Sequence, residues 1–318
     1  MKIKRTPELS RRHFLTCVAM GTAVTFVLPR RLLADGESPV TVIRGAAATA
    51  KITIQKLRGN VSVLQGSGGN IAVLTGRDGT VLVDAGITAS RPRITDALGE
   101  ISSDPVRRLI NTHWHFDHTD GNEWLHSIGA EITAHENTRK HLSETTRVDA
   151  WNFTFPPSPA GALPTKVFKK EQKLHVNGTP LALEYYGPCH TDSDISVYFA
   201  DADILHVGDT WWNGHFPFID YNTGGSINGM IRAAEANVAR VWEKTVIIPG
   251  HGPSGSKAGL IEFRDMLVTI RDKVSSLKKQ GRTIEEVLTT KPTSDYDAKW
   301  GGFVIDGKAF TSLVYQGV

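Results

Sequence analysis

Cysteine is almost absent from this sequence, which has only Cys17 and Cys189 among its 318 residues. Because Cys17 lies in an N-terminal segment of distinct charge, a fold built on a disulfide framework is excluded. The G-x-S-x-G motif of serine hydrolases is missing too, since the run 252–255, Gly-Pro-Ser-Gly, does not fit it. The composition, 40% hydrophobic and 22% charged, is that of a globular protein long enough for one large domain or two small ones.

A strong charge of one sign is missing from most of the chain. The formal net charge is +3, but residues 1–34 contain seven Lys or Arg and one Glu. The remainder has 29 basic and 32 acidic residues, a net charge of −3, so a nucleic-acid partner is not indicated.

Long hydrophobic runs are missing as well. The apolar stretch 14–28 is too short, and too interrupted by Thr and Gly, for a stable membrane span in the processed protein.

The basic N-terminus has the features of a targeting segment. The run 10–15, Ser-Arg-Arg-His-Phe-Leu, precedes the apolar stretch and resembles a twin-arginine export signal. This resemblance implies a signal peptide over residues 1–34, the twin-arginine export machinery as a partner and a periplasmic location. Cleavage after Ala34 is one possibility, and cleavage within 46–50 is another. An amphipathic surface segment is the alternative interpretation.

Two rounds of short strands followed by helices are expected after residue 50. The first predicts strands at 52–57, 61–64, 71–74 and 81–83, a helix capped by Ser90, a strand at 106–110, a helix from about 120, a strand at 130–134 and a helix at 137–146. The second predicts strands at 174–176, 181–186, 196–199 and 204–207, a helix at 226–244 and a strand at 246–248. Two such halves, stacked sheet to sheet with their helices outside, make a four-layer α/β sandwich.

Two further segments stand apart from this pattern. Residues 147–170 are expected to form a loop with an aromatic edge, either a lid over a cleft or a surface segment. Residues 257–288 have apolar side chains at helical spacing. The expected organisation is therefore a sandwich domain over 51–255 and a helical C-terminal extension over 256–318, packed on the domain.

The run 111–118, Asn-Thr-His-Trp-His-Phe-Asp-His, is the most informative stretch of the chain. It places four metal-binding side chains, those of His113, His115, Asp117 and His118, directly after a predicted buried strand. Imidazole nitrogen and carboxylate oxygen are common ligands of Zn²⁺, and no helix or strand period requires this cluster. The run therefore predicts one half of a metal site.

The second half is expected just beyond other strand ends. His190 follows a strand through a Gly-Pro-Cys turn, Asp209 ends the run 205–209, and His251 lies within Pro-Gly-His-Gly at 249–252. In each case an apolar strand leads into a glycine-containing turn, where the backbone bends sharply and presents one metal-type side chain.

Together these motifs resemble the metallo-β-lactamase-fold hydrolase superfamily over about residues 50–255. The resemblance implies an αββα sandwich that binds two zinc ions, with Fe or Mn as alternatives. It implies that His113, His115 and His190 hold one ion, that Asp117, His118 and His251 hold the other, and that Asp209 bridges them. A metal-bound water that ionises near pH ~7 would then be the nucleophile.

Asp117 is the expected catalytic residue, because it would bind metal and also orient the attacking water. The candidates for the substrate pocket are mostly aromatic and lie near the predicted ligands: Trp211, Trp212, His215, Phe216 and Tyr186. His215, Tyr185 and Tyr186 are also candidate donors to a developing oxyanion. Such a pocket suits an apolar or cyclic ester-like small molecule.

Three functions follow as hypotheses, because the fold does not decide the chemistry. The main hypothesis is a periplasmic dinuclear zinc hydrolase that attacks an ester, lactone, thioester or amide carbonyl. The second is an exported metallo-β-lactamase, although no Lys follows Asp209 to hold a β-lactam carboxylate. The third is a periplasmic protein that binds metal without turnover.

Overall fold

The computed structural model describes residues 38–318. The predicted signal peptide and Cys17 therefore lie outside the described residues. Export by the twin-arginine machinery stays a prediction. The elements of the first half are α1 (Pro39–Ala47), β1 (Thr53–Lys56), β2 (Val61–Gln65), β3 (Ile71–Leu74), β4 (Thr80–Val83), α2 (Arg91–Ile101), β5 (Val106–Ile110), α3 (Phe116–Thr119), α4 (Asn122–Ser127), β6 (Glu131–His135), α5 (Glu136–Ser143), β7 (Thr146–Val148), β8 (Phe153–Phe155) and β9 (Lys166–Phe168).

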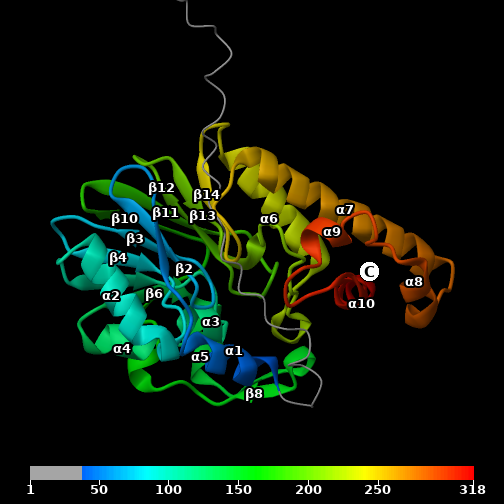
Figure 1. The fold of residues 1–318 in the computed structure, drawn as a ribbon, viewed down its shortest axis with the longest axis horizontal. Coiled ribbons are helices and arrows are strands. Elements are labelled where there is room, and N and C mark those ends of the chain that lie inside the picture. Colours follow the sequence, from blue (N-terminus) through cyan, green and yellow to red (C-terminus); the bar gives the residue numbers. More distant parts are fainter. Residues whose placement is uncertain (1–37) are drawn as a thin grey trace, which may run out of the picture.

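The second half repeats the order of strands followed by helices, and a group of helices then ends the chain (Figure 1). Its elements are β10 (Glu171–Val176), β11 (Thr179–Tyr185), β12 (Ile195–Phe199), β13 (Ile204–His206), α6 (Ile227–Arg240), β14 (Val246–Ile248), α7 (Lys257–Lys279), α8 (Ile284–Thr290), α9 (Asp297–Trp300) and α10 (Gly307–Gly317).

Two mixed sheets form the centre of the molecule. The first has seven strands in the order β1-β2-β3-β4-β5-β6-β9, and the second has five in the order β10-β11-β12-β13-β14. In the first sheet β1 to β4 pair antiparallel, which confirms the predicted meander, and β4, β5, β6 and β9 pair parallel. In the second, only β13 and β14 are parallel. Apart from the loop of His190, the loops that contain the predicted metal ligands follow the carboxyl ends of parallel strands.

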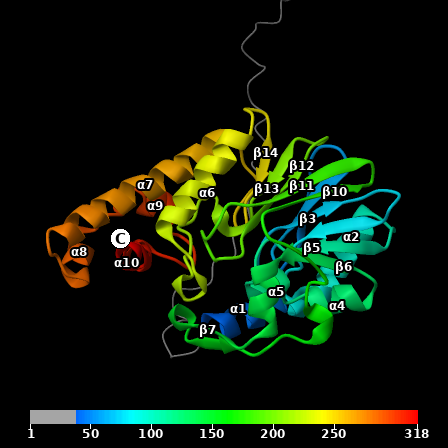
Figure 2. The ribbon, with the colours of Figure 1, turned by 180° about the vertical axis from the view of Figure 1, so that it is seen from behind.

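Alternation along the strands creates the layers, because successive side chains point to opposite faces of a sheet. In β3, Ala72 and Leu74 face the second sheet, whereas Ile71 and Val73 face α2 and α4. In β13, Ile204 faces the first sheet, and Leu205 packs against α6 and α7. Helices thus cover both outer faces (Figure 2). The predicted four-layer α/β sandwich is confirmed.

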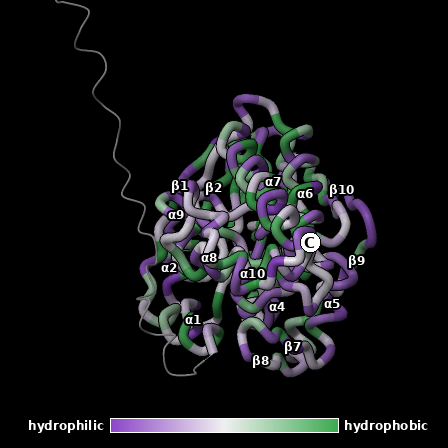
Figure 3. The backbone as a smooth tube through the Cα atoms, turned by 90° about the vertical axis from the view of Figure 1, so that its right-hand side faces the viewer, coloured by the Kyte–Doolittle hydropathy of each residue, from purple (hydrophilic) through white to green (hydrophobic). Residues whose placement is uncertain are grey.

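The hydropathy of the chain follows the same layers. Figure 3 shows hydrophobic stretches running through the interior and hydrophilic ones along the outer turns, including the turn between β9 and β10. Lys169 and Lys170 in that turn, and Glu171 at the start of β10, are all exposed. Among residues 38–318, no helix is both long enough and apolar enough to cross a membrane.

Three local expectations were wrong. Residues 147–170 are not simply a loop, because they contain most of the β7–β8 hairpin and also β9, which extends the first sheet. The helix expected over 137–146 ends at Ser143, and Thr146 already begins β7. The helical pattern over 257–288 is broken into α7 and α8 near Gly281, whose φ of 79° is incompatible with a continuous helix.

Helix α1 was not expected, and it lies against the loop that carries the first metal motif. Ser38 caps it, and the same hydroxyl donates to the carbonyl of Trp151 at 2.8 Å. Arg44 pairs with Asp120 at 2.8 Å, directly after α3. The Val40 side chain is fully buried. The helix therefore belongs to the folded domain.

Candidate metal centre

The loop after β5 positions the first four candidate ligands. The backbone N–H of Thr112 donates to Asp84 Oδ1 at 2.7 Å, which fixes the start of the loop. The chain then turns into the short helix α3, where the N–H of His118 donates to the carbonyl of His115 at 3.0 Å. As a result His113 and His115 leave the loop, while Asp117 and His118 project from α3.

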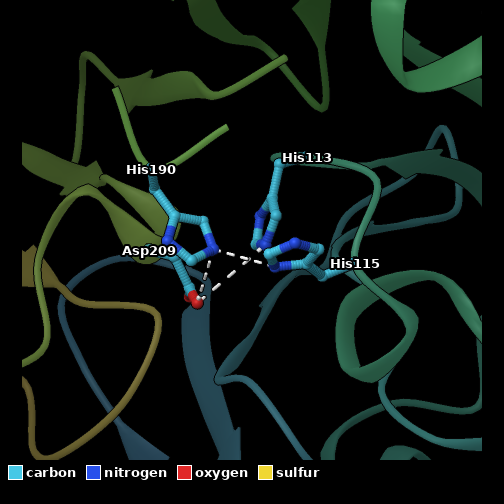
Figure 4. Close-up of side chains that lie close together, drawn as sticks. All are labelled: His113, His115, His190 and Asp209. Atoms are coloured by element: carbon cyan, nitrogen blue, oxygen red, sulfur yellow. Dashed lines mark hydrogen bonds and ion pairs between the residues drawn. The ribbon is translucent and has the colours of Figure 1, made fainter. Parts of the chain in front are cut away.

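A first group of metal-type atoms comes from His113, His115, His190 and Asp209, whose donor atoms all lie within 4.8 Å of one another. Figure 4 shows these four side chains pointing toward a common centre. His190 Nε2 lies 2.8 Å from His115 Nδ1 and 3.4 Å from Asp209 Oδ2. Each of the four side chains is at most 2% exposed.

A second group consists of Asp117, His118 and His251, again within 4.8 Å of one another. Asp209 lies between the two groups, because its Oδ1 is 3.1 Å from His118 Nε2 and its Oδ2 is 3.3 Å from His251 Nε2. The structure thus brings together all seven residues singled out in the sequence.

The far ring nitrogens of four histidines are held by other groups. His113 Nδ1 contacts Thr112 Oγ1 at 3.0 Å, His115 Nε2 contacts Asp220 Oδ2 at 3.1 Å, His118 Nδ1 contacts Asp84 Oδ2 at 2.8 Å and His190 Nδ1 donates to the carbonyl of Phe218 at 2.8 Å. Such contacts fix the tautomer and orientation of metal-binding histidines. They leave the opposite nitrogen of each ring free to face the centre.

Several atoms at the centre are buried without a hydrogen-bond partner in the described part of the chain. They are His113 Nε2, His118 Nε2 and Asp209 Oδ1, of which the last two lie 3.1 Å apart but do not have the geometry of a hydrogen bond. Buried polar atoms are normally paired, because an unpaired one costs about 1–3 kcal/mol. Imidazole nitrogens and a shared carboxylate are the donors that zinc takes, so these residues fit a pair of divalent cations.

The electrostatics of the centre also favour a cation. Burial raises the pKa of Asp209, but four surrounding histidines outweigh this effect and hold that pKa well below its usual range. Burial lowers the pKa of His118, but Asp209, Asp117 and Asp84 outweigh it and raise the pKa well above its usual value. Negative charge therefore accumulates at the second group and must be balanced there by protons or by metal.

Glycine allows two turns to approach the ligands closely. A Cβ atom at Gly250 would lie 1.9 Å from Asp209 Oδ1, and one at Gly69 would lie 2.1 Å from the ring of His118. Neither position has room for a side chain. The glycine-rich turn after β2, residues 66–70, therefore packs directly on the metal loop.

The predicted pocket residues divide into two sets. Trp212 lies beside His251, with ring centroids 4.4 Å apart, and His215 lies close by. Burial and nearby His251 lower the pKa of His215 to about 4, so its ring is neutral at pH 7.

Trp211, Phe216 and Tyr186 lie elsewhere, which corrects their assignment to the pocket mouth. Trp211 and Phe216 are fully buried in the core under α6 and α7. Tyr186 packs against the same core and accepts a hydrogen bond from Ser196 at 3.2 Å. Trp211 and Trp212 are adjacent in an extended segment, so their side chains point to opposite sides.

Asp84 and Asp220 are site residues that the sequence analysis missed. Asp84 accepts hydrogen bonds from the backbone and hydroxyl of Thr112 and contacts His118, in a backbone conformation with φ of 69°. Asp220 contacts His115 and also accepts from Thr223 Oγ1 at 2.7 Å. The sequence did contain a signal for Asp84, which directly follows the apolar strand β4 in a turn that contains Gly86, just as Asp209 and His251 lie in glycine-containing turns after strands.

Aromatic side chains cover the centre on two sides. Trp151, from the turn of the β7–β8 hairpin, lies 4.7 Å from His115 and 4.8 Å from Phe218 between ring centroids. Phe303, from the segment between α9 and α10, lies 6.0 Å from His251. The segment that the sequence suggested as a lid therefore places one side chain directly against a candidate ligand.

The sandwich and its paired histidine and aspartate groups define a protein of the metallohydrolase class. The sequence profile described as "Metallo-beta-lactamase superfamily" matches residues 64–272. Since that match covers well over half of the chain, the chain belongs to the metallo-beta-lactamase superfamily.

Individual known proteins are similar to this chain over part of its length. The alpha subunit of 2,4-dinitroanisole O-demethylase from Nocardioides sp. is 29% identical over 35% of this chain and 30% of its own. The cytoplasmic isozyme of hydroxyacylglutathione hydrolase from Saccharomyces cerevisiae is 25% identical over 51% of this chain and 56% of its own. The chain thus spans about a third and about half of these relatives. A metallo-beta-lactamase from Pontibacter korlensis has the same fold, with a TM-score of 0.55 and 19% identity over 68% of this chain and 99% of its own.

Proposed function

We propose that this protein is an exported dinuclear zinc hydrolase that acts on an ester, lactone, thioester or amide carbonyl. The observation that carries the proposal is the pair of donor groups that meet at Asp209. The far nitrogens of four of their five histidines are held by Thr112, Asp220, Asp84 and the Phe218 carbonyl. The yeast relative is named as a hydrolase of an acyl-glutathione, which supports carbonyl hydrolysis.

When bound, two zinc ions supply a water that ionises near neutral pH and polarise the carbonyl under attack. The chain's own residues position that water. Asp117 is the most exposed of the seven at 13%, and its Oδ2 lies 3.3 Å from His251 Nε2. Burial raises the pKa of Asp117, but His118 and His251 outweigh this effect and lower it, so the carboxylate stays ionised at pH 7 and can accept a proton.

Metal analysis and a substrate panel test the proposal. We expect two zinc ions per purified chain and hydrolysis of at least one lactone, thioester or aryl ester, with activity lost on chelation and restored by zinc. Turnover of nitrocefin alone would indicate the β-lactamase function instead. Zinc binding without turnover of any carbonyl or phosphoester substrate would favour the accessory protein.

The position of signal cleavage gives a separate prediction. Cleavage within 46–50 would remove α1, together with the hydrogen bond from Ser38 to Trp151 and the ion pair of Arg44 with Asp120. We therefore expect cleavage after Ala34, and N-terminal sequencing of protein from the periplasmic fraction to begin at Asp35. A mature chain that begins after residue 46 would contradict this expectation.

Replacing both Arg11 and Arg12 by lysine should block export by the twin-arginine route.

A further inference from the structure

Phe303 lies beside the second group of candidate ligands although it comes from the far end of the chain. Its ring centroid is 4.6 Å from that of His215, 5.9 Å from that of Trp212 and 6.0 Å from that of His251. It lies outside residues 64–272, which the superfamily profile matches. The C-terminal extension thus adds a side chain to the surroundings of the site.

The extension holds this position firmly on both sides of Phe303. Trp300, three residues earlier, is buried at 2% exposure, and its carbonyl accepts a hydrogen bond from the N–H of Phe216 at 2.9 Å. Phe310 stacks on Phe216 with ring centroids 4.9 Å apart. Between these anchors, residues 301–306 are irregular, and a Cβ at Gly302 would meet nothing within 4 Å. Phe303 therefore belongs to a short segment with room to adjust between two fixed ends.

Two polar atoms in the same cluster are buried and unpaired within the described residues. They are Trp212 Nε1 and His215 Nδ1. Trp212 is 5% exposed and His215 is 9% exposed. Pairing of the backbones of Trp212 and His251 fixes the indole beside the ligand, and the N–H of Asn213 donates to the carbonyl of His251 at 2.9 Å. Buried indole N–H groups usually have a hydrogen-bond partner. A bound ligand is therefore expected to supply the acceptor for Trp212 Nε1.

We propose that Trp212, His215 and Phe303 form a substrate subsite beside the second metal position, which binds a flat aromatic substituent carrying a hydrogen-bond acceptor. The partly buried ring of Phe303 supplies the stacking surface beside Trp212, Trp212 Nε1 supplies a donor, and His215 Nδ1 supplies a donor or an acceptor according to its tautomer. The subsite selects aromatic over small aliphatic substrates. This inference rests on the proposed hydrolase function, because it names the group attached to the carbonyl.

Binding of product-like carboxylates tests the subsite without relying on turnover. The affinities of acetate, phenylacetate and the three pyridylacetate isomers are measured by calorimetry on the zinc-loaded full chain. Phenylacetate should bind about tenfold more tightly than acetate, since stacked aromatic pairs contribute on that scale. At least one pyridyl isomer should bind more tightly than phenylacetate. Equal affinities for acetate and phenylacetate would overturn the proposal.

Variants assign the effect to residues. F303A should abolish the preference for phenylacetate over acetate, and F303L, which keeps an apolar side chain without the flat ring, should reduce it. V304A, an apolar truncation at the next position, serves as the matched control and should preserve the preference. W212F and H215F should remove the preference for the pyridyl isomer while phenylacetate still binds. Unchanged preferences in F303A, in a variant that melts like the wild type, would refute the subsite.

The two proposals fail in distinguishable ways. If lactones and esters are not hydrolysed but the aromatic preference depends on Phe303, the proposed reaction is wrong and the subsite stands. If they are hydrolysed, with equal kcat/KM for γ-butyrolactone and the aryl-fused lactone dihydrocoumarin and no difference in carboxylate binding, the reaction stands and the subsite is wrong.

Discussion

Replacing Asp117 by asparagine is expected to lower kcat for lactone or ester hydrolysis by about 10²–10⁴-fold, the range that a positioned proton acceptor contributes. Asparagine has nearly the same shape and keeps one oxygen for the metal, but it has no negative charge with which to accept a proton. Oδ2 of Asp117 contacts both His118 and His251, so the variant also loses charge at the second group. Measurement of kcat at saturating zinc separates lost chemistry from lost metal.

A matched control lies directly after the same short helix. Asp120 is three residues further on, 22% exposed, and it pairs with Arg44 rather than with the candidate ligands. D120N makes the same chemical change and should leave kcat within a small factor of the wild type, since partly exposed ion pairs contribute at most about 1 kcal/mol. Comparable losses in both variants would mean that α3 had been disturbed. Full activity in D117N would remove Asp117 from the mechanism.

Most of the fold could be predicted because the strands are short, apolar and separated by glycine-rich turns. The carboxyl ends of β4, β5, β13 and β14 lie near one another, so polar residues placed just after these strands converge. This rule predicted that His113, Asp209 and His251 lie close together although they are far apart in sequence, as the structure shows. It depends only on sheet topology, which a regular pattern of strands and helices specifies well.

The covering elements could not be predicted in the same way. Helix α1 lies between the predicted signal peptide and residue 51, in a stretch where the sequence predicted no element, although Val40 and Ala47 are buried. The β7–β8 hairpin has only three residues in each strand, too few for a periodic signal. Phe303 lies in an irregular segment whose position depends on contacts made by Trp300 and Phe310 on either side. These features arise from tertiary packing, which local patterns do not encode.

The two adjacent tryptophans illustrate the same limit. Trp211 and Trp212 are chemically identical and follow Asp209 together, so composition gave no reason to separate them. In the structure Trp211 packs near Gly255 and Gly259 in the core, whereas Trp212 lies against His251. Separating them requires knowing which way the chain turns after Asp209. The aromatic side chains beside His251 are those of Trp212 and of Phe303, which comes from another part of the chain.

Asp84 is expected to control zinc binding at the second group through the tautomer of His118. Its Oδ2 lies 2.8 Å from His118 Nδ1, which keeps the proton there and leaves Nε2 as the metal-facing lone pair. In D84N, the side-chain oxygen can accept from the Thr112 N–H, which places the NH₂ group beside Nδ1. Nδ1 must then act as an acceptor, and the proton moves to Nε2. We expect zinc affinity at that position to fall by about 10–100-fold in competition with a chelator.

The choice of asparagine separates this effect from backbone strain. Asp84 has a φ of 69°, a region that asparagine tolerates and most other residues adopt only at a cost of roughly 1–2 kcal/mol. D84N should therefore lose about 1–3 kcal/mol in urea unfolding, from the impaired buried hydrogen bonds. D84A should lose more, because it adds the strain. Wild-type zinc affinity in D84N would show that Asp84 does not set the tautomer.

D220N extends the argument to the first group, where Asp220 holds His115 Nε2 and Thr223. If the two carboxylates act locally, each variant should weaken one of the two zinc-binding events that the proposed dinuclear function predicts for a titration, and leave the other near its wild-type affinity. If both variants weaken both events equally, the coupling runs through Asp209, which contacts His190 of one group and His118 of the other. In that case the two ions bind cooperatively, and losing either carboxylate removes the shared site.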